Sequence, residues 1–173
     1  MNRITRDEAR ALAVELGLDE ELRVHAEGVA HRAETICEIL EGAGHKIDTE
    51  KVVVAALLHD LGRTRAHGLN HAAVSAEILL KRGLKKAAEI VKVHALPQTG
   101  KLSLEAKVLI YADTTTGPDG EPIDPMKKLE FLRRLGDEWV NEEEKLLAKE
   151  AYEVKRRVVS EVDTLIKRAM AAS

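Results

Sequence analysis

The residues best suited to chemistry are the adjacent pair His59 and Asp60, which close an apolar run that begins at Val52. Burial and the negative end of a helix dipole both disfavour a charged carboxylate at the end of a buried helix. We therefore expect a positive charge beside Asp60. Arg63 or Arg65 would supply it in an ordinary ion pair, and a bound cation is the alternative.

Three further polar residues occupy inward-facing positions on other apolar segments: His25, His94 and Asp113. A single buried histidine is usually a hydrogen-bonded core residue. Several such residues on separate segments instead favour a shared cation. Imidazoles and carboxylates without thiolates suit a divalent transition metal (Mn, Fe, Co, Ni or Zn, with Mg as a further option) better than they suit a cysteine-rich structural zinc site.

A metal site of this kind indicates hydrolysis. A divalent ion lowers the pKa of bound water toward neutrality and offsets charge on a phosphoryl oxygen, so that water can attack phosphorus without a protein nucleophile. The sequence contains no phosphate-binding P-loop, no dinucleotide-binding glycine motif and no nucleophile elbow. The single cysteine, Cys37, lies roughly 120° around its helix from His25 and is predicted to be structural.

The spacing of apolar residues predicts an all-α fold that would position these side chains. A capping box at Thr5 opens a short helix, and a longer amphipathic helix is expected from Asp19 to about Gly42. Thr49 is expected to cap a central buried helix that ends at Gly62 and carries His59 and Asp60 in its last turn. Alternating apolar and polar residues, the pattern of a strand, do not occur.

The second half of the chain continues the helical pattern. Asn70 is expected to cap a helix, and the predicted helices run from His71 to about Arg82, from Lys85 to about Ala95, from Ser103 through Asp113, and from Pro125 onward. The tail from about Asn141 to Met170 reads as one long amphipathic helix. We expect its apolar stripe to pack back onto the domain, and a homodimer joined through this helix is the alternative.

Composition sets limits on partners and location. The chain has 173 residues, of which 45% are hydrophobic and 33% charged, so a single domain over 1–173 is the default. One cysteine and the lack of a signal region or membrane-spanning run predict a cytoplasmic protein without a membrane partner. A net charge of −3 gives no support for nucleic-acid binding.

Three motifs resemble the H…HD…D signature of the HD superfamily of metal-dependent phosphohydrolases. They are His25-x-x-x-Val29-Ala30, Leu57-Leu58-His59-Asp60-Leu61-Gly62-Arg63 and Tyr111-Ala112-Asp113. The resemblance covers about residues 20–116. It implies an HD-type helical bundle, with 125–173 as a C-terminal helical extension. It also implies that one metal ion is held by His25, His59, Asp60 and Asp113.

A subset of that superfamily has two additional histidines that hold a second metal ion, with the aspartate of the doublet bridging both ions. His71 and His94 fall where this subset has its extra ligands. The resemblance therefore implies one or two ions in the site.

The substrate is less well defined by these motifs. The segment from His94 to Asp113 is similar to enzymes that split diadenosine tetraphosphate symmetrically, but Gly62-Arg63 stands where those enzymes commonly carry Ala-Lys. Small archaeal HD proteins of unassigned substrate are at least as similar around His71. We expect a phosphate ester or anhydride of a nucleotide or a related small molecule. The alternative is a regulatory module that binds metal or nucleotide without turnover.

Several basic residues are candidates for substrate binding. Arg63 is predicted to take part in catalysis and hold a substrate phosphate, with a salt bridge as the alternative. Lys101 has the same two interpretations. His67 is expected to line the pocket or to cap its turn. His31 and His45 are expected at the surface.

Overall fold

The computed structural model describes residues 4–66, 68–95, 100–138 and 142–172. Within these ranges it contains helices and no strand, which confirms the all-α prediction. The α-helices are α1 (Arg6–Glu15), α2 (Glu20–Gly42), α3 (Thr49–Leu58), α4 (His71–Lys81), α5 (Lys85–Val91), α6 (Leu104–Thr114), α7 (Pro125–Glu138) and α8 (Glu142–Ala171). Two short 3-10 turns, Leu61–Thr64 and Gly68–Asn70, lie between α3 and α4.

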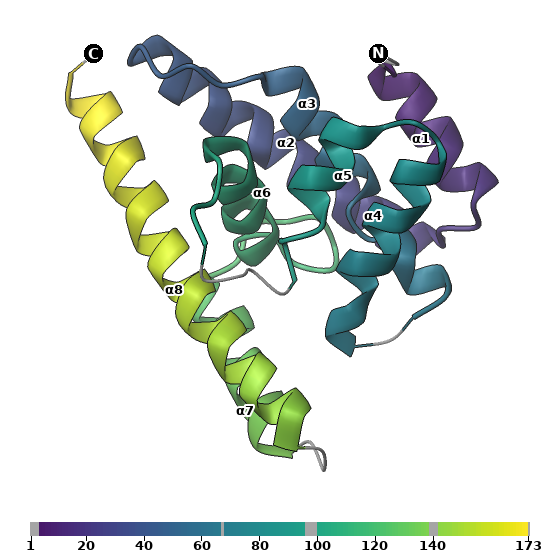
Figure 1. Ribbon diagram of the computed structural model, residues 1–173. Coiled ribbons are helices and arrows are strands. Elements are labelled where there is room, and N and C mark those ends of the chain that lie inside the picture. The colour runs from purple at the N-terminus through teal and green to yellow at the C-terminus, as the bar shows by residue number, and fades with distance from the viewer. Residues whose placement is uncertain (1–3, 67, 96–99, 139–141, 173) are drawn as a thin grey trace.

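Helix α3 forms the centre of the helical body because it is apolar on every side. All its residues from Val52 to Leu58 are buried, and it contacts α1, α2, α5 and α6. Figure 1 shows these helices grouped around α3, with α4 packed beside α5. The C-terminal end of this central helix is where His59 and Asp60 leave it, so the doublet enters the middle of the body.

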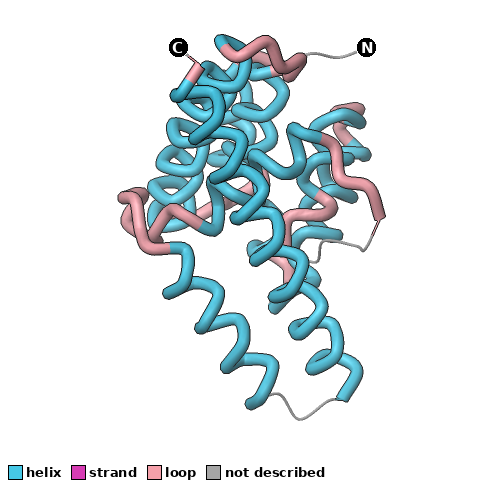
Figure 2. The backbone as a smooth tube through the Cα atoms, turned by 90° about the vertical axis from the view of Figure 1, so that its left-hand side faces the viewer, coloured by secondary structure: helices cyan, strands magenta, loops and turns pink. Residues whose placement is uncertain are grey.

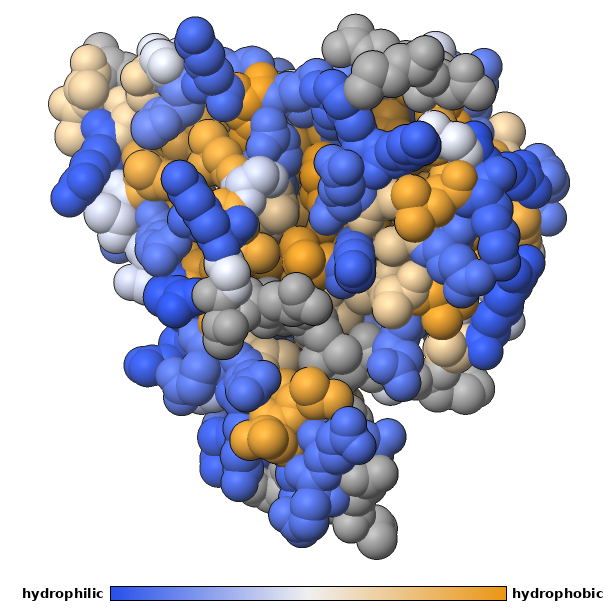
Figure 3. Space-filling model, in the orientation of Figure 1, coloured by the Kyte–Doolittle hydropathy of each residue, from blue (hydrophilic) through white to orange (hydrophobic). Residues whose placement is uncertain are grey.

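Helices α7 and α8 form a hairpin that extends beyond the body (Figures 1 and 2). Further along, α8 returns to pack on α6 and α2 through buried residues that include Val154, Val158 and Val162. The predicted packing of the apolar stripe onto the domain is thus confirmed. The protruding part carries apolar surface (Figure 3). Phe131 of α7 and Leu146 of α8 are exposed. A dimer joined through α8 stays a prediction.

Three predicted helix boundaries are wrong, and two of these errors lie next to the site. Asp48, not Thr49, caps α3, by accepting a hydrogen bond from the amide of Lys51. Helix α3 ends at Leu58 and not at Gly62, so His59 and Asp60 follow the helix. Asn70 makes no side-chain cap for α4, because the 3-10 turn leads directly into that helix.

Helix α5 also ends earlier than predicted, at Val91, and His94 lies three residues beyond it. The C-terminal ends of α3 and α5 have the same physical cause. The Nδ1 atom of His59 bonds to the carbonyl oxygen of Ala56 at 2.6 Å, and that of His94 bonds to the carbonyl oxygen of Val91 at 2.7 Å. In a continuing helix these carbonyl oxygens would accept hydrogen bonds from backbone amides of the next turn. Here the histidine side chains donate to them instead.

Gly62 allows α4 to approach the turn that follows α3. A Cβ atom at this position would lie 2.0 Å from the carbonyl oxygen of His71 and 2.7 Å from the amide nitrogen of Ser75. The absence of a side chain therefore brings His71 next to the HD doublet. Within the described ranges, no helix is both long and apolar enough to cross a bilayer.

Candidate metal centre

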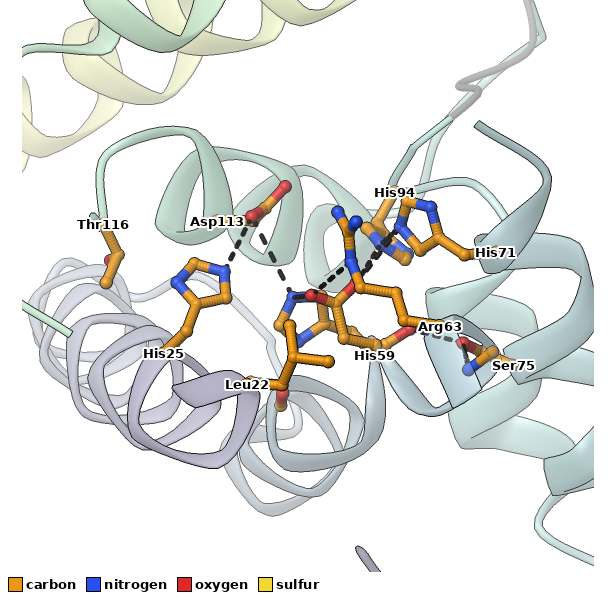
Figure 4. Close-up of polar contacts among 12 residues, drawn as sticks. Leu22, His25, His59, Arg63, His71, Ser75, His94, Asp113 and Thr116 are labelled. Carbon is orange, nitrogen blue, oxygen red and sulfur yellow. Dashed lines mark hydrogen bonds and ion pairs between the residues drawn. The ribbon is translucent and has the colours of Figure 1, made fainter. Parts of the chain in front are cut away.

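Six polar residues from five separate segments meet in the middle of the body (Figure 4). Each is between 0% and 7% exposed. They are His25 of α2, His59 and Asp60 after α3, His71 at the start of α4, His94 after α5, and Asp113 of α6. The structure thus brings together every residue that the sequence suggested as a metal ligand.

All four imidazole rings are fixed in the same tautomer. Each Nδ1 atom lies within hydrogen-bonding distance of a backbone carbonyl oxygen: Gly117 for His25 at 2.8 Å, Ala56 for His59 at 2.6 Å, Gly68 for His71 at 2.6 Å and Val91 for His94 at 2.7 Å. Because a carbonyl oxygen only accepts, Nδ1 carries the hydrogen in each ring. Every neutral ring therefore presents the lone pair of Nε2 to the centre, which is the form that binds metals.

The lone pairs converge on one another. His71 Nε2 lies 3.0 Å from His94 Nε2 and 3.1 Å from Asp60 Oδ1. Within the described part of the chain, His59 Nε2 and Asp60 Oδ1 are buried and lack a hydrogen-bond partner. Buried acceptors that face one another repel unless a positive charge lies between them. The arrangement fits a cation by its own chemistry.

The ligand atoms form two groups that share Asp60. In one group, atoms of His25, His59 and Asp60 all lie within 4.8 Å of one another, and in the other the same holds for Asp60, His71 and His94. Asp113 lies beside the first group, with its Oδ1 atom 3.3 Å from His25 Nε2 and 3.9 Å from His59 Nε2.

Burial governs the charge states at the centre. It lowers the pKa of His59 to about 3 and also lowers that of His94, so both rings are neutral ligands at pH 7. Burial disfavours the charge of Asp60, yet the pKa of this carboxyl lies well below its usual value, and the guanidinium of Arg63 is the permanent cation in contact with it. Asp60 therefore remains anionic while the imidazoles of His59 and His94 remain uncharged.

Comparison with known proteins agrees with this geometry. The sequence profile of the HD domain matches residues 9–117, which is more than half of the chain. The chain belongs to the HD domain family. HD domains form a superfamily of metal-dependent phosphohydrolases, and the predicted resemblance to that superfamily is confirmed.

Two relatives of this HD protein come from archaea. An uncharacterized protein of Methanocaldococcus jannaschii is 33% identical over 129 residues, which cover 65% of this chain and 76% of the relative. A tRNA (cytidine(56)-2'-O)-methyltransferase of Thermoplasma volcanium is 44% identical over 48 residues, which cover 27% of this chain and 14% of that enzyme. No solved structure matches the chain at a significant level.

Two lysines that lie at this HD site were not predicted from the sequence. Both follow the part of the chain that matches the family. Lys128 of α7 contacts Asp113 Oδ1 at 2.7 Å, and Lys155 of α8 contacts Asp113 Oδ2 at 3.4 Å. Burial disfavours the charge of Asp113, but Lys128 and Lys155 hold its pKa well below the usual value. The sequence did contain a signal for Lys155, which lies four residues from both Ala151 and Val159 on the buried face of α8.

Ser75 of α4 is a further residue that sequence reasoning missed. Its Oγ atom donates to the carbonyl oxygen of His59 at 2.6 Å and accepts from the amide of Gly62 at 2.7 Å. Ser75 thereby fixes the turn that carries the HD doublet against α4. A serine between a valine and an alanine of an apolar helix gives little indication of this role in the sequence.

The predicted substrate-binding residues have different surroundings. Arg63 Nε bonds to Asp60 Oδ2 at 2.9 Å while its side chain stays 44% exposed, so it forms the predicted ion pair and also reaches solvent. Lys101 is exposed, and His67 lies outside the described residues. His31 and His45 are exposed, which confirms their predicted surface positions.

Proposed function

We propose that this HD protein hydrolyses a phosphate ester or anhydride of a nucleotide or a related small molecule. In this proposal, one divalent transition-metal ion is held by His25, His59, Asp60 and Asp113. A second ion is held by Asp60, His71 and His94. The observation that carries the proposal is the convergence of buried lone pairs, above all the 3.0 Å approach of His71 Nε2 to His94 Nε2.

The residues of the chain divide the work of such a reaction. When bound, a divalent ion lowers the pKa of water and offsets charge on a phosphoryl oxygen. The bonds from each Nδ1 atom to a carbonyl keep the four rings oriented before any ligand arrives. Arg63 pairs with Asp60 through its Nε atom, and among the described residues no partner bonds to its terminal guanidinium nitrogens. These nitrogens are therefore suited to hold a substrate phosphate at the solvent-exposed side.

The experiment that tests the proposal combines metal analysis with a substrate panel. Purified protein is analysed for bound metal and then assayed, with added Mn, Co, Ni and Mg, against a phosphomonoester, a generic phosphodiester and a set of nucleotides. Diadenosine tetraphosphate belongs in this set because of the local resemblance in the sequence. We expect metal-dependent hydrolysis of at least one compound.

The variant His31→Ala is the matched control, because His31 is an exposed histidine on the same helix as His25. It should keep both metal and activity, while His25→Ala should lose them. A protein that binds metal and nucleotides but turns over none of them would favour the regulatory alternative. A protein that binds no divalent metal would contradict the proposal.

The printed name of the Thermoplasma volcanium relative refers to tRNA, but the matched segment is 14% of that enzyme. The net charge of −3 gives no support for binding to an RNA backbone. We therefore propose a small phosphorylated substrate.

A further inference from the structure

Lys128 and Lys155 reach the same carboxylate but use their N–H groups differently. The Nζ atom of Lys128 donates to Asp113 Oδ1 at 2.7 Å, to the carbonyl oxygen of Asp113 at 2.6 Å and to the carbonyl oxygen of Thr116 at 3.3 Å. An ammonium has three N–H groups, so all of them are used. Lys128 therefore ties α7 to the end of α6 and holds Asp113 in position.

Lys155 is only 9% exposed, yet its Nζ atom makes one long contact, 3.4 Å to Asp113 Oδ2. Charge-assisted hydrogen bonds of this type are usually about 2.7–2.9 Å long. Across the described ranges no second acceptor contacts this ammonium, so two of its N–H groups have no protein partner there. Because Asp113 also lies against His25 and His59, its contact with Lys155 places this ammonium on the side of the metal ligands.

A buried ammonium with unused donors is costly unless oxygen atoms from elsewhere satisfy it. Phosphoryl oxygens are suitable acceptors because they are anionic and each accepts several hydrogen bonds. The position of Lys155 next to Asp113 would let it bind such oxygens beside the ion that Asp113 helps to hold.

The charge balance of the site points to the kind of phosphate. Asp60 and Asp113 are paired with the three cations Arg63, Lys128 and Lys155, so these five groups already carry one net positive charge. Divalent ions would add positive charge, and among the described residues no third carboxylate pairs with these groups. A ligand with two or more negative charges compensates this better than a ligand with one.

We propose that Lys155 binds the phosphoryl oxygens of the substrate and that the site prefers doubly charged, terminal phosphate groups over singly charged phosphodiesters. This inference rests on the proposed function and specifies its substrate class. Lys128 acts as a positioning residue, since its donors are occupied by the protein. Both lysines come from helices outside the HD match, so the C-terminal hairpin completes a site that the family core only begins.

The test measures binding and metal content separately from turnover. Inorganic phosphate and dimethyl phosphate are titrated calorimetrically into the metal-loaded protein at about pH 8, where phosphate is a dianion and dimethyl phosphate a monoanion. The variants are Lys155→Met, Lys155→Arg and, as the matched control, Lys167→Met, which changes an exposed lysine of the same helix. Metal content and thermal unfolding are recorded for each.

We expect the wild type to bind phosphate at least about tenfold more tightly than dimethyl phosphate. Lys155→Met should weaken phosphate binding about tenfold with unchanged metal content, and Lys155→Arg should restore most of the affinity. Lys167→Met should behave as the wild type. If Lys155→Met does not fold, Lys155→Gln replaces it.

Unchanged phosphate affinity in a folded, metal-containing Lys155→Met variant would overturn the inference, and so would equal wild-type affinity for both anions. Loss of metal from Lys155→Met would also overturn it, because the lysine would then support Asp113 only. A wild type that binds metal and shows these preferences but hydrolyses nothing would refute the proposed function and leave the inference standing.

Discussion

The two aspartates of the site have similar burial but opposite electrostatic surroundings. Asp60 is 2% exposed and Asp113 is 6% exposed. The Oδ1 atom of Asp60 lacks a hydrogen-bond donor within the described part of the chain and faces imidazole lone pairs, whereas each oxygen of Asp113 is contacted by a lysine. Asp60 therefore lacks a positive charge that a bound cation could supply at Oδ1, whereas two lysines of the chain balance the negative charge of Asp113.

Both groups of potential ligands share Asp60, whereas Asp113 lies beside one of them. This difference separates two tasks that a signature motif combines. In the proposed site Asp60 is shared between two cations, and Asp113 is held anionic and oriented by two lysines as a further ligand of one of them. Variants at the two positions should consequently fail in different ways.

The largest effect is expected for Asp60→Asn. Because Asp60 is the residue common to both ligand groups, its neutralisation should remove both ions and lower hydrolysis by at least about a thousandfold, which corresponds to several kcal/mol of transition-state stabilisation. Metal analysis and rates measured on the same preparation check this. Retention of one tightly bound ion would show that Asp113 can hold metal alone, and the contrast between the two aspartates would be lost.

The next effect concerns stability without metal. Asp113→Asn leaves Lys128 and the buried Lys155 without their carboxylate, and breaking a buried ion pair in this way costs about 3 kcal/mol or more. Asp60→Asn removes a charge whose Oδ1 atom has no donor, so it should cost less. Urea unfolding of both metal-free variants measures the difference. Equal losses of unfolding free energy in the two variants would contradict the proposed difference between Asp60 and Asp113.

Gly62→Ala should damage the Asp60 side selectively. The added methyl group would meet the backbone of α4 and push His71 away from Asp60, at a cost of about 1–3 kcal/mol in unfolding free energy. The group formed by His25, His59 and Asp60 takes no ligand from α4, so one ion should remain. Metal analysis that finds both ions still bound would show that the close approach at Gly62 is not required for the second group.

The smallest effect is expected for Ser75→Ala. This change removes the hydroxyl that bonds the carbonyl oxygen of His59 and the amide of Gly62, and it should cost about 1–2 kcal/mol while both ions still bind. Thermal unfolding and metal titration test this together. Loss of an ion would mean that Ser75 orients the HD doublet more strictly than its two bonds indicate.

The histidines and aspartates of the site were predicted from the sequence much better than the two lysines that contact Asp113. The histidines and aspartates could be found because polar residues stand out on apolar helices and their order resembles a known signature. Lys128 could not be found, because α7 is amphipathic and one lysine among its charged residues is unremarkable until the hairpin is folded. Lys155 is a charged residue on the otherwise apolar buried face of α8. Its role could be assigned only from the structure, which packs this face beside Asp113.

The fold was predicted well for helices whose ends have local caps, such as Thr5, Asp19 and Ser103. It was predicted poorly at His59 and His94. There the helices end because histidine side chains bond to carbonyl oxygens in the last turn, and residue-type patterns do not carry that information.

The most direct test of the central claim is anomalous diffraction from a crystal of this protein soaked in Mn²⁺. We predict two peaks per chain, each roughly 2.2 Å from an oxygen of Asp60, one beside His25 and His59 and the other beside His71 and His94. Peaks that avoid Asp60, or no peak among these side chains, would contradict the account.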